Sequence, residues 1–330
     1  MYRVLVTPPN MDVASLDLLR AQGCDLILPD KAESDLTTAE LASLLQEADA
    51  WIIGPSAHVT RDLVASAPNC QIFARRGVGY DRLDITAIHE LGRVAAIATG
   101  GNDASVADST IGLILAVCRR MREHQQAMLL GDWSIRVSSD LYRKTVGIIG
   151  MGRTGRAVLQ RLKGFEVRIL ATTPRPDAQL AQESITFTDL ATLLRESDIV
   201  TIHAPLTQST HHLIGRAELA AMKQGAVLIN TARGGLVDDE ALLEALTRGH
   251  LAGAGLDVYE GESEIAKKPI AQALLNLPQV VGTPHAAAST REGLARTNHI
   301  IAQVVAALLK GEPVPQDCLV TDGRNNHHSI

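Results

Sequence analysis

Residues 146–155, Val-Gly-Ile-Ile-Gly-Met-Gly-Arg-Thr-Gly, form a short apolar run that passes directly into the pattern Gly-x-Gly-x-x-Gly. The run has the composition of a buried β-strand, and the residues that follow, through Leu162, have helical spacing. In such a unit Gly150 permits a tight turn, Gly152 lets the backbone approach a pyrophosphate, and Gly155 lets the helix pack near the strand. Main-chain N–H groups at the helix start attract phosphates. The stretch therefore predicts a dinucleotide-binding unit.

The position of this motif indicates more than one domain. A chain of 330 residues is long for a single hydrophobic core, and residues 1–145 precede the motif. Short β-type runs alternate with helical patterns over residues 3–98, which predicts a parallel sheet with helices on both faces. We also expect a buried helix over Ser105–Arg120, a less regular stretch over Met121–Leu141 and a frayed polar tail after Gly311.

Composition argues against several classes of function. The net charge is −6, no basic block is present and aromatic residues make up 3%, so we expect no nucleic-acid partner. No apolar run approaches the ~18–20 residues that cross a bilayer, so we expect no membrane segment. The four cysteines lack Cys-x-x-Cys or Cys/His spacing, which predicts no metal site. This cysteine usage, with no signal sequence after Met1, is typical of a cytoplasmic protein.

Polar clusters follow the expected strands in the second half of the chain. They begin at His203, Asn230, Asp257 and Thr283. Because ligands bind beyond the carboxyl ends of strands in an α/β sheet, we expect these clusters to line one site. His203 is a candidate for the cofactor pocket within this set.

His285 is the strongest candidate for an acid/base. It follows Pro284 at a strand end, and the small residues Ala286 to Ala288 leave space for a ligand. Histidine is the natural proton carrier near neutral pH. Glu262, from the preceding strand end, is its candidate partner, because a hydrogen-bonded carboxylate stabilises the protonated ring and fixes its tautomer. A purely structural histidine is the alternative.

Two features are suited to a substrate carboxylate. Arg233, beside Gly234 and Gly235, can bind a carboxylate through two donors while polarising an adjacent carbonyl. The Gly-x-Gly turn within Arg75–Asp81 can expose successive backbone N–H groups, with arginines adding positive potential. A structural arginine and an ordinary solvated loop are the respective alternatives.

The strand after the glycine helix, Val167–Leu170, bears on the choice of dinucleotide. NAD-binding domains usually place an acidic residue after this strand to bind the ribose hydroxyls. Here Ala171 is followed by Thr-Thr-Pro-Arg, so Thr173 and Arg175 can accommodate a 2′-phosphate. NADP is therefore favoured over NAD, although NAD binding beside a solvated Arg175 stays open.

With these residues in view, the sequence resembles the D-isomer-specific 2-hydroxyacid dehydrogenase family. The resemblance covers nearly the whole chain, in order and spacing. Its motifs are Arg-x-Gly-x-Gly-x-Asp at 75–81, Ser-Val-Ala-Asp-x-Thr at 105–110, Gly-Met-Gly-Arg-Thr-Gly at 150–155, His-Ala-Pro-Leu-Thr at 203–207, Asn-Thr-Ala-Arg-Gly-Gly at 230–235, Leu-Asp-Val-Tyr-Glu-Gly-Glu at 256–262 and Thr-Pro-His-Ala-Ala-Ala-Ser-Thr at 283–290.

The resemblance implies an α/β architecture in which a Rossmann nucleotide-binding domain is inserted into a flavodoxin-like substrate domain. Residues 1–101 and 287–330 would form the substrate (catalytic) domain, and residues 102–286 the dinucleotide-binding domain. The active site would lie in a cleft between them. A homodimer is also implied. The less regular stretch 121–141 is a candidate dimer arm, and a surface loop is the alternative.

The resemblance also implies roles for single residues. His285 would be the acid/base, Glu262 its partner, and Arg233 the anchor of the substrate carboxylate and carbonyl. The N–H groups of Val78 and Gly79 would hold the carboxylate, with Arg75 among the substrate-binding residues. The cofactor would be bound by Gly150, Gly152, Arg153, Thr154, Gly155, Thr173, Arg175, Ala204, Pro205, Thr231, Ala232 and Asp257.

Departures from the family pattern refine the expected substrate. Ser263 stands where the family usually has proline, which puts the rigidity of that loop in doubt. Thr173 with Arg175 is similar to NADP-using glyoxylate/hydroxypyruvate reductases. Val78 replaces a threonine common in phosphoglycerate dehydrogenases, which weakens that assignment, and Glu262 replaces the glutamine of formate dehydrogenases.

We therefore expect an oxidoreductase acting on CH–OH donors. It would reduce a small 2-keto acid, with glyoxylate or hydroxypyruvate favoured, to the D-2-hydroxy acid. Phosphoglycerate, a bulkier keto acid and phosphite remain alternatives within the family. A dinucleotide-sensing corepressor-like binding protein is the alternative from another class.

Overall fold

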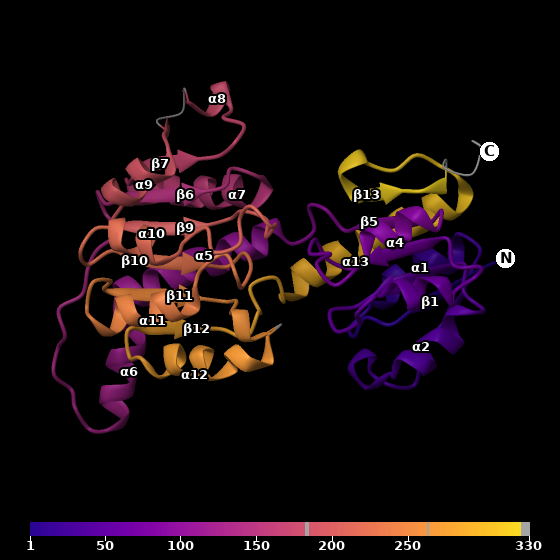
Figure 1. Ribbon diagram of the computed structural model, residues 1–330, viewed down its shortest axis with the longest axis horizontal. Coiled ribbons are helices and arrows are strands. Elements are labelled where there is room, and N and C mark those ends of the chain that lie inside the picture. The colour runs from indigo at the N-terminus through magenta and orange to yellow at the C-terminus, as the bar shows by residue number, and fades with distance from the viewer. Residues whose placement is uncertain (182–184, 263, 325–330) are drawn as a thin grey trace. The chain divides into compact units, whose positions relative to one another are not determined.

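The computed structural model describes residues 1–181, 185–262 and 264–324 (Figure 1). The chain divides into two compact units, one formed by Met1–Asn102 with Ser289–Ile330 and the other by Asp103–Ala288. The second unit is thus inserted into the sequence of the first. Within the described residues, every helix is too short or too polar to span a bilayer.

The first unit is a sheet covered by helices on both faces. Its strands follow the order β13-β5-β4-β3-β1-β2, parallel throughout except that β13 is antiparallel to β5. The order 2-1-3-4-5 is that of flavodoxin-like sheets, as expected. The strands are β1 (Tyr2–Val6), β2 (Cys24–Ile27), β3 (Ala50–Ile53), β4 (Ile72–Arg75), β5 (Val94–Ile97) and β13 (Leu319–Asp322). The helices are α1 (Val13–Ala21), α2 (Thr38–Leu45), α3 (Arg61–Ala65), α4 (Ile85–Glu90) and α13 (Arg291–Lys310), with 3₁₀ turns at Glu33–Asp35 and Gln316–Cys318.

Alternation along the strands places two cores on opposite faces of this sheet. In β3, Ala50 and Ile52 pack in one cluster, and Trp51 and Ile53 pack in the other. Helix α13 covers the first cluster, so the C-terminal part of the chain completes a sheet that the N-terminal part begins.

The expectation of a frayed tail after Gly311 is wrong for Leu319–Asp322. These residues pair with the otherwise open edge of β5, and the neighbouring Cys318 is buried. The segment is too short and too polar to be recognised as a strand from its pattern alone. Residues 325–330 lie outside the described residues.

The second unit has the strand order β12-β11-β10-β9-β6-β7-β8, with all pairs parallel. Renumbered along the unit, this includes the order 3-2-1-4-5-6 of the Rossmann fold, which confirms the expected fold class. The strands are β6 (Thr145–Ile149), β7 (Arg168–Thr172), β8 (Ile185–Phe187), β9 (Ile199–Ile202), β10 (Val227–Asn230), β11 (Gly253–Leu256) and β12 (Val280–Gly282). The helices are α5 (Asp103–Cys118), α6 (Met121–Leu129), α7 (Arg153–Leu162), α8 (Ala178–Ala181), α9 (Leu190–Glu196), α10 (Arg216–Ala221), α11 (Asp239–Thr247) and α12 (Lys268–Asn276), with 3₁₀ turns at Lys163–Phe165, Glu260–Glu262 and Ile265–Lys267.

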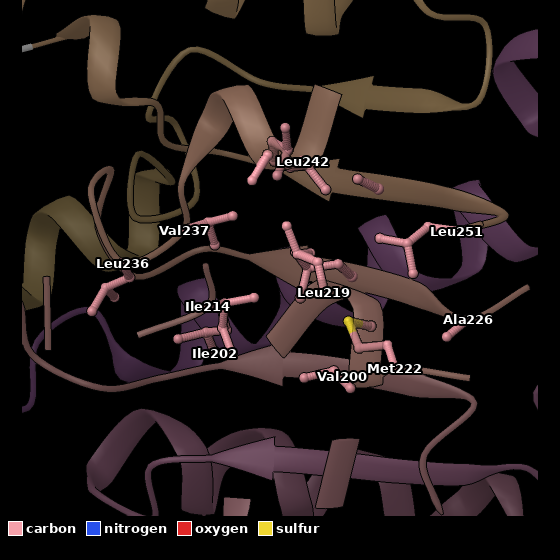
Figure 2. Packing of buried hydrophobic residues seen from close by; sticks show 14 of the residues in the cluster. Val200, Ile202, Ile214, Leu219, Met222, Ala226, Leu236, Val237, Leu242 and Leu251 are labelled. Carbon is pink, nitrogen blue, oxygen red and sulfur yellow. The ribbon is translucent and has the colours of Figure 1, made fainter. Parts of the chain in front are cut away.

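Helices pack on both faces of this sheet as well. Figure 2 shows one of the two cores, a cluster that includes Val200 and Ile202 of β9, Leu219 of α10 and Leu242 of α11. Ile199, one residue out of step, belongs to the opposite core under α5 and α7. These two cores fix the sheet whose carboxyl edge carries the polar clusters.

The stretch expected to be irregular contains a helix. Residues Met121–Leu129 form α6, separated from α5 by Arg119 and Arg120, of which Arg120 has a left-handed conformation with φ of 50°. The positive φ ends α5 and redirects the chain, which hydrophobic spacing cannot indicate. Residues 130–144 then contain no helix or strand.

Candidate active site

The glycine loop lies at the point where the strand order of the second unit reverses. Strand β6 has β9 on one side and β7 on the other, and α7 follows it. Gly150 has φ of 95°, and a Cβ atom on Gly155 would lie 2.1 Å from the carbonyl oxygen of Gly150. These two glycines are therefore required by the backbone itself.

Gly152 has a different environment. It has an ordinary φ of −72°, and a Cβ atom there would meet nothing within 4 Å in the described structure. Gly152 is also the N-cap of α7, where the described residues provide no side-chain cap and no acidic residue in the first turn. Arg153 is exposed, and its Nε donates to Asp103 at 2.9 Å. Open space beside a helix start without a side-chain cap fits a pyrophosphate.

The end of β7 offers no carboxylate at the position expected for NAD selectivity. Thr173 is partly buried and Arg175 is exposed. The next acidic residue, Asp177, accepts a hydrogen bond from Arg156 at 2.8 Å. The two residues identified from the sequence thus lie just beyond the carboxyl end of β7, beside the strand of the glycine loop.

The structure brings His285 and Glu262 together. Nδ1 of His285 lies 2.8 Å from Oε2 of Glu262, and Oε1 of Glu262 accepts the main-chain N–H of Tyr259 at 2.7 Å. The His285 side chain is 48% exposed, so the ring is open to a ligand. With Nδ1 bound to the carboxylate, Nε2 is the atom placed for proton exchange.

The backbone of His285 is held by Asp257. His285 has φ of 54°, and its N–H donates to the carbonyl oxygen of Asp257 at 2.8 Å. The buried Asp257 carboxylate accepts from Thr283 Oγ1 at 2.5 Å, from Ala286 N at 2.7 Å and from Ala287 N at 3.0 Å. Asp257, assigned from the sequence to the cofactor, is thus seen to bind the loop that carries the histidine.

Arg233 lies on a turn fixed by Asn230, a strand-end residue to which the sequence assigned no role of its own. The buried Asn230 side chain accepts from Ala232 N at 3.0 Å and donates to the carbonyl oxygen of Arg233 at 2.9 Å. Thr231 is buried and pairs with Thr110 of α5 at 2.9 Å. An asparagine at the last position of a buried strand is the sequence feature that could have indicated this turn-stabilising role.

The Arg233 turn lies directly against the turn that carries Glu262. A Cβ atom on Gly234 would lie 2.2 Å from the carbonyl oxygen of Tyr259. Only glycine permits this approach, so Arg233 and Glu262 occupy adjacent turns.

His203 is uncharged at neutral pH. Its Nε2 pairs with Thr201 Oγ1 at 2.9 Å, and its Nδ1 is buried without a hydrogen-bond partner among the described residues. Burial lowers the pKa of His203 to about 4. Ala204 is partly buried and Pro205 is exposed. Both follow His203, whose carbonyl oxygen would lie 2.5 Å from a Cβ atom added to Gly150.

Arg75 supports its own loop in the first unit. Its Nε donates to the carbonyl oxygen of Gly79 at 3.2 Å, and its Nη1 donates to that of Ile53 at 3.4 Å. Gly77 has φ of 137°, and Val78 and Gly79 are partly buried. Arg75, expected to bind substrate, thus lies behind the Val78–Gly79 turn in hydrogen bonds to the backbone.

Comparisons with known proteins show which family this chain is similar to. The family model "D-isomer specific 2-hydroxyacid dehydrogenase, NAD binding domain" matches residues 111–287. A hydroxypyruvate reductase of Thermotoga maritima is 36% identical over 89% of this chain and 94% of its own length. A D-3-phosphoglycerate dehydrogenase of Methanocaldococcus jannaschii is 35% identical over 94% of this chain, which spans only 58% of that relative's length.

A solved structure extends the likeness to three dimensions. The D-lactate dehydrogenase of Aquifex aeolicus, crystallised with NAD and lactic acid, is 28% identical, with a TM-score of 0.84 over 94% of this chain and 96% of that chain. The NAD-binding model covers more than half of the sequence, and the hydroxypyruvate reductase match includes both units. The chain therefore belongs to the D-isomer specific 2-hydroxyacid dehydrogenase family.

Proposed function

We propose that this protein is an NAD(P)-dependent oxidoreductase that reduces a small 2-keto acid to the D-2-hydroxy acid, with glyoxylate or hydroxypyruvate as the favoured substrate. The observation that carries the proposal is the 2.8 Å contact between His285 and Glu262, on a turn packed against that of Arg233. A proton donor, its orienting carboxylate and a carboxylate-binding cation are the groups that this reaction requires.

Each of these side chains has a role in the reduction. His285 donates the Nε2 proton to the carbonyl oxygen as C2 receives a hydride, and the C=O double bond becomes a C–OH single bond. Glu262 holds Nδ1–H, fixes the tautomer and stabilises the ring while it is protonated. Arg233 binds the substrate carboxylate and polarises the carbonyl. A bound nicotinamide dinucleotide supplies the hydride, and Gly150, Gly152, Arg153, Thr154 and Gly155 would hold its pyrophosphate.

Substitution of His285 and Arg233 tests the site assignment. His285→Ala and Arg233→Ala should each lower kcat/KM by about 10²-fold or more, because proton transfer and substrate positioning are lost. Thermal unfolding of both variants checks that they fold. Near-normal turnover of either folded variant contradicts the assignment.

The proposed cofactor is NADP. Thr173 and Arg175 follow β7, where NAD-binding domains usually have a carboxylate that binds the ribose. Such a carboxylate would repel a 2′-phosphate, whereas threonine and arginine can bind one. kcat/KM with NADPH should exceed that with NADH, and Thr173→Asp with Arg175→Ala should reverse the order. A wild-type preference for NADH contradicts this part of the proposal and leaves the reaction class intact.

A panel of keto acids tests the substrate. The relatives include enzymes named hydroxypyruvate reductase and glyoxylate reductase as well as phosphoglycerate dehydrogenases. Glyoxylate and hydroxypyruvate should give the highest kcat/KM, and phosphohydroxypyruvate a lower value. If no keto acid is reduced while cofactor controls assembly, a corepressor-like binding protein is the better description.

We further propose that the protein is a homodimer joined through residues 121–137. Large apolar side chains gather on this segment, and Met121, His124, Met128, Trp133 and Ile135 are among the residues that line a hollow of about 800 Å³. An apolar surface of this kind on one segment is typical of a protein–protein interface, and a second copy is the commonest partner.

A further inference from the structure

Glu260 is a buried carboxylate that has no role in the proposed reaction. It lies two residues before Glu262, in the same 3₁₀ turn, and its side chain is 1% exposed. A carboxylate this deeply buried is strongly disfavoured unless it is paired. Its partners therefore indicate what it does.

The Glu260 side chain connects three other segments. Its Oε1 lies 2.8 Å from His212 Nε2 and accepts from Lys267 Nζ at 2.6 Å. Its Oε2 accepts from the main-chain N–H of Asp239, at the start of α11, at 3.1 Å. In return, the main-chain N–H of Glu260 donates to Asp239 Oδ2 at 2.9 Å.

These contacts stabilise the ionised form of Glu260. Burial by itself raises the pKa of the Glu260 carboxyl, but the hydrogen bonds from His212, Lys267 and Asp239 outweigh it and hold the pKa below its usual value. The charge also lies at the positive end of α11. The group is therefore a fixed anchor for its own turn.

A metal ion is not the better explanation of this cluster. Side chains of His211, His212 and Glu260 place possible ligand atoms within 4.8 Å of one another. However, the two imidazole rings are stacked, with centroids 4.0 Å apart and 24° between their planes, so their in-plane lone pairs do not converge on one point. The Lys267 ammonium already lies against the Glu260 oxygen.

The anchored turn is the one that aims Glu262. The N–H of Tyr259 donates to Oε1 of Glu262, which leaves Oε2 for His285. The peptide between Tyr259 and Glu260 also forms the surface against which Gly234 packs. A shift of Glu260 therefore moves the Glu262 carboxylate. It also moves the Tyr259–Glu260 peptide that packs against the Arg233 turn.

We infer that Glu260 is a positioning residue for this site: its contacts with His212, Asp239 and Lys267 hold the Tyr259–Glu262 turn so that Glu262 reaches His285. The inference rests on the proposed function of the His285–Glu262 pair. It does not depend on which keto acid or which dinucleotide is used.

A double-mutant cycle between Glu260→Ala and Glu262→Gln tests the inference. The variants are assayed with glyoxylate and the preferred reduced dinucleotide, and dinucleotide Kd is measured separately by fluorescence titration. Glu260→Ala should lower kcat about 10- to 100-fold, as expected for a small misplacement, with Kd within about 2-fold of wild type. In the Glu262→Gln background, Glu260→Ala should lower kcat by less than about 3-fold, because the carboxylate that Glu260 positions is already absent.

Two further variants separate positioning from a general loss of structure. Glu240→Ala removes the same charge from an exposed residue next to Asp239 and should keep wild-type kcat. Glu260→Gln, which keeps an acceptor and the side-chain shape, should recover part of the loss and serves if Glu260→Ala does not fold.

The outcomes are distinguishable. Equal losses in the wild-type and Glu262→Gln backgrounds, or wild-type kcat in Glu260→Ala, overturn the inference while the proposed function stands. Wild-type turnover in both Glu262→Gln and His285→Gln overturns the proposed function, and the inference with it.

Discussion

His285 adopts a backbone conformation that is unfavourable for a residue with a side chain. Its φ of 54° costs about 1–2 kcal/mol relative to ordinary regions. The carboxylate and carbonyl of Asp257 together accept hydrogen bonds from the loop on either side. The ring is therefore placed by contacts of its backbone as well as by Glu262.

Replacement of Asp257 should release this loop. Asp257→Ala leaves the buried N–H of Ala287 and the partly buried N–H of Ala286 unpaired, so we expect the free energy of unfolding to fall by about 2–5 kcal/mol. Urea denaturation measures the change, with the exposed Asp140→Ala as control. A loss under about 1 kcal/mol contradicts the role of Asp257 in holding the loop.

His203 should give the stability of the protein a distinct pH dependence. Its pKa is about 4 in the folded protein, against 6.5 in the unfolded chain. Between these values the unfolded chain binds a proton that the folded protein does not, so stability falls as pH falls from 6.5 towards 4. The loss is up to about 1.4 kcal/mol per pH unit.

The comparison with His203→Gln isolates this effect. Unfolding free energies measured by urea denaturation from pH 7 to pH 4.5 should decline more steeply for the wild type than for the variant. Identical slopes would show that His203 does not remain neutral in the folded protein.

At the scale of elements, the β6–α7 unit contains glycines with different roles. Gly155 touches the Gly150 carbonyl, whereas Gly152 has open space and a φ that alanine accepts. Gly155 is thus required for packing and Gly152 for binding, a difference that the sequence motif alone does not show.

A matched pair of substitutions should separate the two. Gly155→Ala should lower the free energy of unfolding by about 1–3 kcal/mol through overpacking. Gly152→Ala should leave that free energy unchanged or slightly raised, yet weaken dinucleotide binding by about 10-fold or more, because its methyl group occupies the phosphate position. Denaturation and fluorescence titration measure both; unimpaired binding by Gly152→Ala contradicts the proposed phosphate site.

At the scale of the whole molecule, the proposed dimer leads to a prediction about assembly. Trp133 and Ile135 are 74% and 92% exposed. Sedimentation should show a dimer for the wild type and a monomer for Trp133→Ser with Ile135→Ser, because apolar burial is the main driving force of such association. Val13→Ser, at another exposed apolar residue, should remain dimeric, and a monomeric wild type at tens of micromolar would refute the proposal.

Much of the site could be predicted from the sequence because its parts are local. The glycine motif, the strand-end clusters and the candidates His285, Glu262 and Arg233 follow from short patterns and the rule that parallel strands present ligands at their carboxyl ends. Edge strand β13 could not be predicted, because it forms only by pairing with the distant strand β5. Helix α6 could not be predicted either, because it follows a single positive φ at Arg120.

The sequence by itself determined the fold class, the strand-end residues and the need for glycine at two turns. The tertiary structure alone decided which distant groups meet: Asp257 with the His285 loop, Thr231 with Thr110, and Glu260 with His212 and Asp239. The reason is that chain spacing governs local conformation. Contacts between loops, by contrast, depend on strand register and on the close packing of turns, which only the folded sheet establishes.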